Sequence, residues 1–298
     1  MASGGTSGDH GPRPALAFTY AGDDAELLRR VLPLIDIIEI SPDAIATSDG
    51  RRTFLRPEVL AEYCGVAGQV SFVAHGIGLS IGSFDKWEEG YLRLLDQLFA
   101  QVDLSWHSEH LAFTHVAGEN TGTMFPMPRT KEAIELICDR VRRVQECYKV
   151  PFLLEHVIHL LPDAPADFTP AGFLNAIHQR TGCGLILDAY NLECDVHNRG
   201  VDAKAFFDEL NFEPVTELHV AGGTRYQGFQ LDIHSDIASD ETLALAGEII
   251  QRAPNLRAVT FEVLKETAPL LGHDRICGEL VRWREVIAAK AAAPAVAA

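Results

Sequence analysis

The feature that most restricts the fold of this chain is a regular alternation of short apolar runs with amphipathic, helix-like stretches. We predict the apolar runs as strands: Ala15–Thr19, Ile35–Ile40, Val70–Ala74, Leu104–His107, Phe152–Leu154, Gly184–Leu187, Glu217–Val220 and Ala258–Glu262. Several are uniformly apolar, as expected for parallel strands covered on both faces. We predict helices over Asp24–Leu34, Trp87–Val102, Thr130–Tyr148, Thr169–Arg180, Asp202–Glu209, Ser239–Arg252 and Gly278–Ala289, with Thr130 as an N-cap.

Eight strand–helix units predict an α/β protein whose strands close into a single (β/α)8 TIM barrel. A doubly wound open sheet is the alternative. It needs a ligand motif at its switch point, and no Gly-x-Gly-x-x-Gly follows the first run. The 298 residues suit a barrel of about 250 residues with short extensions. We expect one domain over residues 15–287, between a disordered Gly/Ser-rich tail at 1–14 and a fraying Ala-rich tail at 288–298.

The composition argues against a nucleic-acid partner and a membrane span, and it indicates the redox state of the cysteines. The formal net charge is −17, and a surface this acidic repels phosphate backbones, so we expect no nucleic-acid partner. No apolar stretch reaches the roughly 18 residues that a membrane helix needs, so we expect no membrane span. The six cysteines contain no Cys-x-x-Cys pair, which predicts free thiols in a reducing cytoplasm.

Metal-competent side chains end or follow six consecutive predicted strands. They are His75; His107, Glu109 and His110; Glu155 and His156; Asp188 and Asn191; His219 with Asp232 and His234; and Glu262. Each alone has an ordinary explanation as a structural or solvated side chain. A barrel, however, brings the carboxyl ends of its strands to one mouth. Carboxylates gathered there raise one another's pKa unless cations neutralise them, so the pattern predicts a multinuclear metal site.

The donor types indicate which metals such a site takes. Carboxylates and imidazoles without a thiolate pair favour Fe, Mn or Zn over Cu(I). Where two or three ions lie close together, at least one carboxylate must bridge them. Glu155 is the candidate bridge, because its strand lies centrally in the series.

Several segments around these residues occur in the same order in one known family. They are Ala74–Ser83, Ser108–Phe113, Phe125–Pro128, Leu154–Val157, Leu187–Asn191, Glu217–Gly222, Asp232–His234 and Phe261–Glu262. Together they resemble the DUF692 family, also called the multinuclear non-heme iron-dependent oxidative enzymes (MNIO), which includes the methanobactin biosynthesis oxidase. The resemblance covers roughly residues 15–287. The order of the ligands also resembles the endonuclease IV and xylose isomerase superfamily of TIM barrels.

The resemblance implies a grouping of ligands around two or three ions. The first ion would be held by His75, His110 and Glu155. The second would be held by Glu155, Asp188, His219 and Glu262. The third would be held by Asn191, Asp232 and His234, and we expect it to be labile, because asparagine is a weaker ligand than the histidine of the nuclease pattern.

The chain departs from the family pattern beside these residues. Residues 221–223 are Ala-Gly-Gly where the family commonly has Ala-Gly-His, and His156 replaces the usual asparagine. Within the unusual segment Cys194–His197, His197 is either a base that faces the substrate or a solvated loop histidine. We take Glu109 and His197 as the candidate catalytic residues. Because these departures lie beside the expected ligands and not at them, we expect them to affect the substrate and the reaction more than metal binding.

The family resemblance implies an iron-dependent oxidase that uses O2 and mixed Fe(II)/Fe(III) ions. Its expected substrate is a ribosomally made precursor peptide, modified at cysteine, and its expected partner is a protein that binds the leader of that peptide. A metal-dependent hydrolase or sugar isomerase of the same barrel superfamily is the alternative. A degenerate barrel that acts as a binding partner is a third possibility. The sequence names neither the peptide nor the product.

Overall fold

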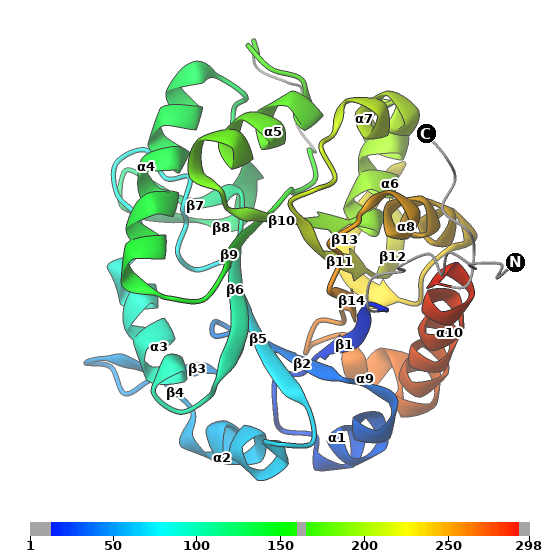
Figure 1. The fold of residues 1–298 in the computed structure, drawn as a ribbon. Coiled ribbons are helices and arrows are strands. Elements are labelled where there is room, and N and C mark those ends of the chain that lie inside the picture. Colours follow the sequence, from blue (N-terminus) through cyan, green and yellow to red (C-terminus); the bar gives the residue numbers. More distant parts are fainter. Residues whose placement is uncertain (1–12, 160–164, 292–298) are drawn as a thin grey trace, which may run out of the picture.

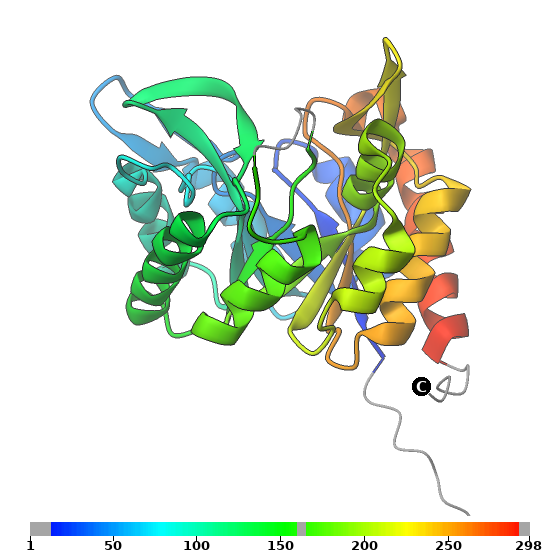
Figure 2. The same cartoon turned by 90° about the horizontal axis from the view of Figure 1, so that it is seen from above.

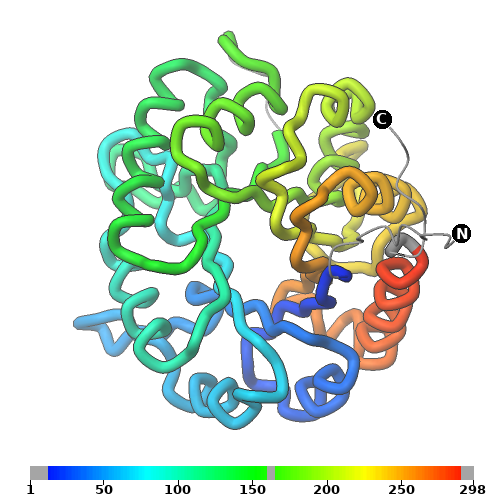
Figure 3. The backbone as a smooth tube through the Cα atoms, in the orientation of Figure 1, coloured from blue at the N-terminus to red at the C-terminus, as the bar shows by residue number. Residues whose placement is uncertain are grey.

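The computed structural model describes residues 13–159 and 165–291, and in this part of the chain eight parallel strands close into a barrel (Figure 1). In barrel order they are β1 (Ala15–Thr19), β14 (Ala258–Phe261), β11 (Val215–Val220), β10 (Gly184–Asp188), β9 (Phe152–Glu155), β6 (Leu104–His110), β5 (Ser71–Gly76) and β2 (Ile37–Ile40). The chain traces a ring of helices around them (Figure 3). The predicted (β/α)8 TIM barrel is confirmed.

Helices cover the outer face of the barrel. They are α1 (Ala25–Val31), α2 (Pro57–Val66), α3 (Glu89–Phe99), α4 (Lys131–Cys147), α5 (Pro170–Thr181), α6 (Ala189–Arg199), α7 (Ala203–Glu209), α8 (Asp240–Arg252), α9 (Ala268–Leu271) and α10 (His273–Ala291). A 3₁₀ turn, Leu32–Leu34, follows α1. The predicted N-cap is present, because Thr130 Oγ1 accepts a hydrogen bond from Ala133 N at 3.2 Å. The sequence interpretation missed α2, α6 and α9.

The barrel encloses its own small apolar core. One inward side chain from each of seven strands forms it: Ala17, Ile37, Val73, Trp106, Leu153, Ile186 and Ala258. A far larger apolar cluster fills the space between the strands and the helices. Fully burying one large apolar side chain contributes about 1.5–3 kcal/mol to folding. These two layers therefore offset the cost of burying polar groups at the barrel mouth.

Three hairpins rise above the end of the barrel at which the strands finish (Figure 2). They pair β3 (Ala46–Ser48) with β4 (Thr53–Leu55), β7 (Ala112–Val116) with β8 (Glu119–Pro126), and β12 (Gly222–Tyr226) with β13 (Phe229–Asp236). They were not predicted, because each is inserted between a barrel strand and a covering helix. The mouth of the barrel therefore lies at the bottom of a rim of loops.

At the chain ends, the predicted tails lie mostly outside the described residues. Residues 1–12 and 292–298 are not described, while residues 288–291 continue α10 as helix. None of the helices in the described ranges is long and apolar enough to cross a bilayer. The six cysteines are free thiols, as the absence of paired spacing predicted.

Candidate metal centre

Four strands end side by side in a carboxylate or an imidazole that points into the barrel mouth. His75 is the next-to-last residue of β5, and His110, Glu155 and Asp188 end β6, β9 and β10. Side chains alternate between the two faces of a strand, so these positions face inward together with His219 of β11. Neighbouring strands hold them in register, since His110 pairs with Glu155 and Asp188 pairs with His219.

Glu155 lies at the centre of the first half of the cluster. Its Oε2 lies 2.8 Å from His75 Nε2 and 3.3 Å from His110 Nε2. Its other oxygen, Oε1, lies 3.6 Å from His219 Nδ1. The rings of His75 and His110 are 4.4 Å apart between centroids, which is too close for both to be comfortably cationic. One carboxylate therefore faces three imidazoles with two differently directed oxygens, as a bridging ligand does.

The second half of the cluster is centred on Glu262 and His234. Glu262 Oε2 lies 3.1 Å from His219 Nδ1 and 3.3 Å from His234 Nδ1. His234 Nε2 lies 2.5 Å from Asp232 Oδ1 and 3.7 Å from Asp188 Oδ2. His234 has a φ of 42°, a left-handed conformation that costs a non-glycine residue about 1 kcal/mol or more. Such strain persists only where the surroundings impose it, and it concentrates at functional sites.

The facing atoms of this cluster are close together but are not hydrogen bonded. The buried atoms without a hydrogen-bond partner include His75 Nε2, Glu155 Oε2, Asp188 Oδ2, Asn191 Oδ1, both ring nitrogens of His219 and His234, Asp232 Oδ1 and Glu262 Oε2. Buried polar atoms are nearly always paired, and an unpaired one costs about 1–3 kcal/mol. Ligands bound at about 2.1 Å to one ion lie about 3 Å apart when they are adjacent. The separations fit donor atoms that converge on shared cations.

Hydrogen bonds behind the cluster fix which nitrogen each ring presents to it. Ser108 Oγ donates to the carbonyl oxygen of Ala74 at 3.0 Å, so it accepts the Nδ1 proton of His75 at 2.8 Å. His110 Nδ1 donates to the carbonyl oxygen of Gly76 at 2.9 Å. Both rings therefore donate from Nδ1, which directs Nε2 toward Glu155. Metal-ligating histidines are oriented in this way by the partner of their other nitrogen.

Asp188 divides its two oxygens between the fold and the cluster. Oδ1 accepts hydrogen bonds from Tyr190 N at 2.6 Å and Asn191 N at 2.9 Å, and so caps the first turn of α6. Oδ2 stays unpaired and faces His234. The cap begins α6 directly at the end of β10, which brings Asn191 Oδ1 to the mouth as a further buried acceptor without a partner.

Electrostatics couple these groups tightly. Burial alone would raise the pKa of Glu155, but the imidazoles of His110, His219 and His75 outweigh burial and hold that pKa well below its usual range. Burial would likewise raise the pKa of Glu262, but His234 and His219 hold it well below its usual range. By contrast, burial raises the pKa of Asp188 to about 8. A cation bound beside Asp188 would reverse this preference, since it favours the ionised form.

The structure brings together most donors of the first two ligand groups that the resemblance implied, whereas Asn191 and Asp232 of the third group belong to none of the compact groups among the described residues. His75, His110 and Glu155 form one compact group, and Glu155, Asp188 and His219 form another. Glu262, expected with the second group, also joins Asp188 and His234. Asp188 and Glu262 therefore lie close to the donors expected for both the second and the third ion, and the ligand set of each ion stays a prediction.

Glu109 does not lie in the cluster. It follows Ser108 on β6 and therefore points to the opposite face, where its Oε1 accepts from Leu79 N at 3.4 Å. A Cβ on Gly76 would lie 1.7 Å from the hydroxyl oxygen of Tyr91, so the lack of a side chain there admits Tyr91 next to Glu109. Burial and the neighbouring Asp43 raise the pKa of Glu109 well above its usual range. A catalytic role for Glu109 stays a prediction, because its side chain does not contact the cluster of candidate metal ligands.

His197 lies on the outer side of α6 and not in a loop. Its Nε2 lies 2.8 Å from Glu241 Oε2 of α8, and Arg225 Nη2 approaches the same nitrogen at 3.3 Å. Glu193, His197 and Glu241 form a separate group that could hold an ion, but both Glu193 oxygens already accept hydrogen bonds from Gln230 and Ser239. The role of His197 as a base also stays a prediction.

Two buried glutamates at the bottom of the site escaped the sequence interpretation. Glu39 lies within β2 and Glu217 within β11, and both are fully buried. Glu39 Oε2 lies 3.1 Å from His219 Nε2, and Glu217 Oε1 lies 3.6 Å from the same nitrogen. The available signal was an acidic residue inside an apolar run, Ile-Ile-Glu-Ile, and a Glu-x-His pair on one face of a strand.

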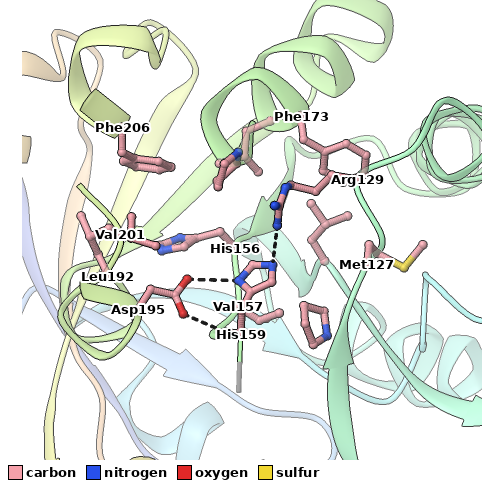
Figure 4. A pocket seen from close by; sticks show the side chains of 14 residues that line it. Met127, Arg129, His156, Val157, His159, Phe173, Leu192, Asp195, Val201 and Phe206 are labelled. Carbon is pink, nitrogen blue, oxygen red and sulfur yellow. Dashed lines mark hydrogen bonds and ion pairs between the residues drawn. The ribbon is translucent and has the colours of Figure 1, made fainter. Parts of the chain in front are cut away.

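A small, mostly apolar cavity of about 40 Å³ lies beside the segment that follows β9 (Figure 4). His156 lines it, with its ring centroid 6.1 Å from that of Phe206. Farther along, His159 Nδ1 lies 3.1 Å from Asp195 Oδ2, and His159 N donates to Asp195 Oδ1 at 2.8 Å. These contacts fasten the segment that follows Glu155 to α6.

Comparison with known proteins identifies a family that covers most of the chain. The model of the family described as "RiPP precursor modification enzyme MbnB/TglH/ChrH" matches residues 23–272. A UPF0276 protein of Anaeromyxobacter sp. is 30% identical over 263 residues, which are 88% of this chain and 89% of that protein. A UPF0276 protein of Caulobacter vibrioides is 30% identical over 213 residues, or 72% and 74% of the two chains.

Solved structures with the same barrel are more distant in sequence. Endonuclease IV from Thermus thermophilus superposes with a TM-score of 0.57 at 16% identity, covering 93% of this chain and 100% of that chain. An L-ribulose 3-epimerase gives a TM-score of 0.60 at 13% identity, covering 93% and 95%. The IolI protein with a bound zinc atom gives 0.60 at 14%, covering 93% and 99%. At these identities the likeness establishes the fold only.

Proposed function

This chain belongs to the MbnB/TglH/ChrH family of RiPP precursor modification enzymes, and we propose that it is a multinuclear non-heme iron enzyme that uses O2 to modify cysteine residues of a ribosomally synthesised precursor peptide. The observation that carries this proposal is the arrangement around Glu155. Three imidazoles face its two oxygens at 2.8–3.6 Å, and the closest contact, to His75 Nε2, lacks hydrogen-bond geometry. Such an arrangement fits a carboxylate that bridges cations.

In this proposal the ligands of the ions are those that converge at the mouth. They are His75, His110, Glu155, Asp188, Asn191, His219, Asp232, His234 and Glu262. Bound iron, as a mixed Fe(II)/Fe(III) set, would supply the O2 activation and electron transfer that no side chain here provides. The nitrogen and oxygen donors suit iron, and none of the groups that could hold an ion in the described residues includes a cysteine.

The side chains themselves would hold and insulate the reacting centre. Ser108 and the carbonyl of Gly76 accept the Nδ1 protons of His75 and His110, so the Nε2 atoms of both rings are directed toward the site. The cap of α6 fixes Asp188. The strands close below the site on Trp106 and Ile186, which exclude water from that side. The open side faces the hairpins, and a substrate has to enter there.

The rim offers a surface suited to an extended peptide. The β12–β13 hairpin rises beside the mouth (Figure 2), and its tip exposes Tyr226 and Phe229, which are 62% and 47% accessible. Exposed aromatic residues at a rim favour protein or peptide contact. A separate protein that binds the leader of the precursor completes the proposal, and we expect both to meet this enzyme in the cytoplasm.

The alternative is a metal-dependent hydrolase or a sugar isomerase, because epimerases and an endonuclease share the barrel. Metal analysis with electron paramagnetic resonance on anaerobically purified protein separates the two. Iron with a paramagnetic ferric signal, and O2 consumption that depends on a cysteine-bearing precursor, would support the oxidase. Zinc or manganese alone, with no O2 consumption, would support the alternative. A short cysteine-bearing reading frame beside the gene would provide the precursor for this assay.

A further inference from the structure

Glu39 is a carboxylate enclosed in the barrel below the candidate metal centre. It occupies the middle of β2 and is fully buried. Thr19 Oγ1 donates a hydrogen bond to Oε1 at 2.7 Å, whereas Oε2 has no hydrogen-bond partner. Burying a carboxylate is costly unless its oxygens are used, so the direction of Oε2 calls for a function.

The ring of His219 lies between two pairs of carboxylates. On the mouth side, Nδ1 lies 3.1 Å from Glu262 Oε2 and 3.6 Å from Glu155 Oε1. On the inner side, Nε2 lies 3.1 Å from Glu39 Oε2 and 3.6 Å from Glu217 Oε1. A neutral imidazole carries one proton, so only one of its nitrogens can bind an ion and the other must carry N–H.

Glu217 is the less available of the two inner carboxylates. Trp106 Nε1 donates to its Oε2 at 2.7 Å, and Thr260 Oγ1 donates to its Oε1 at 2.5 Å. These two donors hold Glu217 in place and reduce its demand for a third. Glu39 Oε2 is both closer to His219 and without any donor, so it is the acceptor that the Nε2 proton faces.

We propose that Glu39 is a positioning residue of the metal centre, whose Oε2 keeps the proton of His219 on Nε2 and so leaves Nδ1 free for the ion shared with Glu155 and Glu262. This inference rests on the metal centre of the proposed function. His75 and His110 obtain the same control from a serine hydroxyl and a backbone carbonyl, and Glu39 is the charged counterpart. A carboxylate in this position also makes the imidazole a stronger donor.

The test is a titration of the metal-free full-length protein with Zn²⁺ against a competing chelator. Glu39→Gln should keep the number of ions but bind the most affected one about 10–100-fold more weakly, the range typical of such partners. Glu39→Asp should fall between Gln and wild type. Glu279→Gln is the matched control, because Glu279 of α10 is also buried and accepts from Ala238 N and from Arg282, outside the candidate metal centre. It should bind as wild type does.

A second measurement separates positioning from direct ligation and from misfolding. In ¹⁵N spectra of the Zn²⁺-loaded wild type, His219 should carry its proton on Nε2 and its metal on Nδ1. Metal on Nε2, or loss of a whole ion in Glu39→Gln while its melting temperature is unchanged, would overturn the inference, as would unchanged affinity. If wild type itself bound no ion, the proposed metal centre would fail too. Equal binding by wild type and Glu39→Gln would remove only the role of Glu39.

Discussion

Nε2 of His75 lies 2.8 Å from Oε2 of Glu155, and neither atom takes part in a hydrogen bond. The Nδ1 proton of His75 is held by Ser108, so Nε2 is the nitrogen that faces the carboxylate. When Nε2 carries no proton, it and Oε2 are two acceptors, which repel each other at this distance unless a cation lies near both.

Removing the charge of Glu155 should disrupt the whole centre. Glu155→Gln removes the anionic oxygens that His75, His110 and His219 face, and we expect metal affinity to fall by more than about 100-fold, beyond the range for supporting residues. Metal content per chain after gentle purification checks this, with Glu279→Gln as the control. Full metal content in Glu155→Gln would refute the bridging role.

His234→Ala should affect one end of the centre only. His234 contacts Asp232, Glu262 and Asp188 but lies away from His75 and His110, so we expect loss of the third ion and retention of the first. Stoichiometric Zn²⁺ titration would resolve the separate ions. Equal weakening of every ion would show that the ligand grouping is wrong.

Ser108→Ala should weaken binding without removing a ligand. The hydroxyl fixes the Nδ1 proton of His75, so its loss frees the ring to turn and to change tautomer, and we expect about 10–100-fold weaker binding of the first ion. Ser71→Ala, at the exposed start of the same strand as His75, is the matched control. If both variants bound metal as wild type does, the hydrogen bond would have no orienting role.

The metal-free protein should lose stability as pH rises from about 6.5 to about 9. Burial would lower the pKa of His75, but Glu155 outweighs burial and raises that pKa to about 9, and burial raises the pKa of Asp188 to about 8. For both groups the pKa in the folded state is higher than the pKa in the unfolded chain. Their protonated forms therefore stabilise the folded protein at low pH, and this stabilisation is lost as the pH rises through the folded-state pKa values. Melting temperatures with chelator at pH 6.5 and pH 9 test this.

Bound metal should remove most of that pH dependence, because the ions hold the deprotonated forms of His75 and Asp188 in the folded state. The metal-loaded protein is therefore the internal comparison for the melting experiment. A metal-free protein that melts higher at pH 9 than at pH 6.5 would contradict the assigned protonation states.

The strands of the barrel were predictable because each is a short apolar run. Eight such strands, each followed by a helix, are compatible with only a few sheet topologies, and the closed barrel is one of them. Their ends were predictable as a site for the same reason, since His75, Glu155 and Asp188 each follow such a run directly. The helix α6 was missed because its first turn, Ala189–Asn191, is defined by the side chain of Asp188 and not by an apolar period.

Residues that act from within a strand were harder to find. Glu39 and Glu217 lie inside apolar sequence, where neither carboxylate marks a strand end. Only the closed barrel shows that both face His219. Glu109 is the opposite case: like His110 it lies at the end of a strand, where a site was predicted, but its side chain is on the other face of β6. Alternation along the strand decides between such neighbours, provided that the register is known.

The most direct measurement of the central claim is a crystal structure of the anaerobically iron-loaded protein with anomalous diffraction data collected at the iron edge. We predict at least two iron peaks at the barrel mouth, with Glu155 bound to two of them through its separate oxygens and with Nδ1 of His219 bound to one. Anomalous maps without iron between Glu155 and the facing imidazoles, collected from protein shown to contain iron, would contradict it.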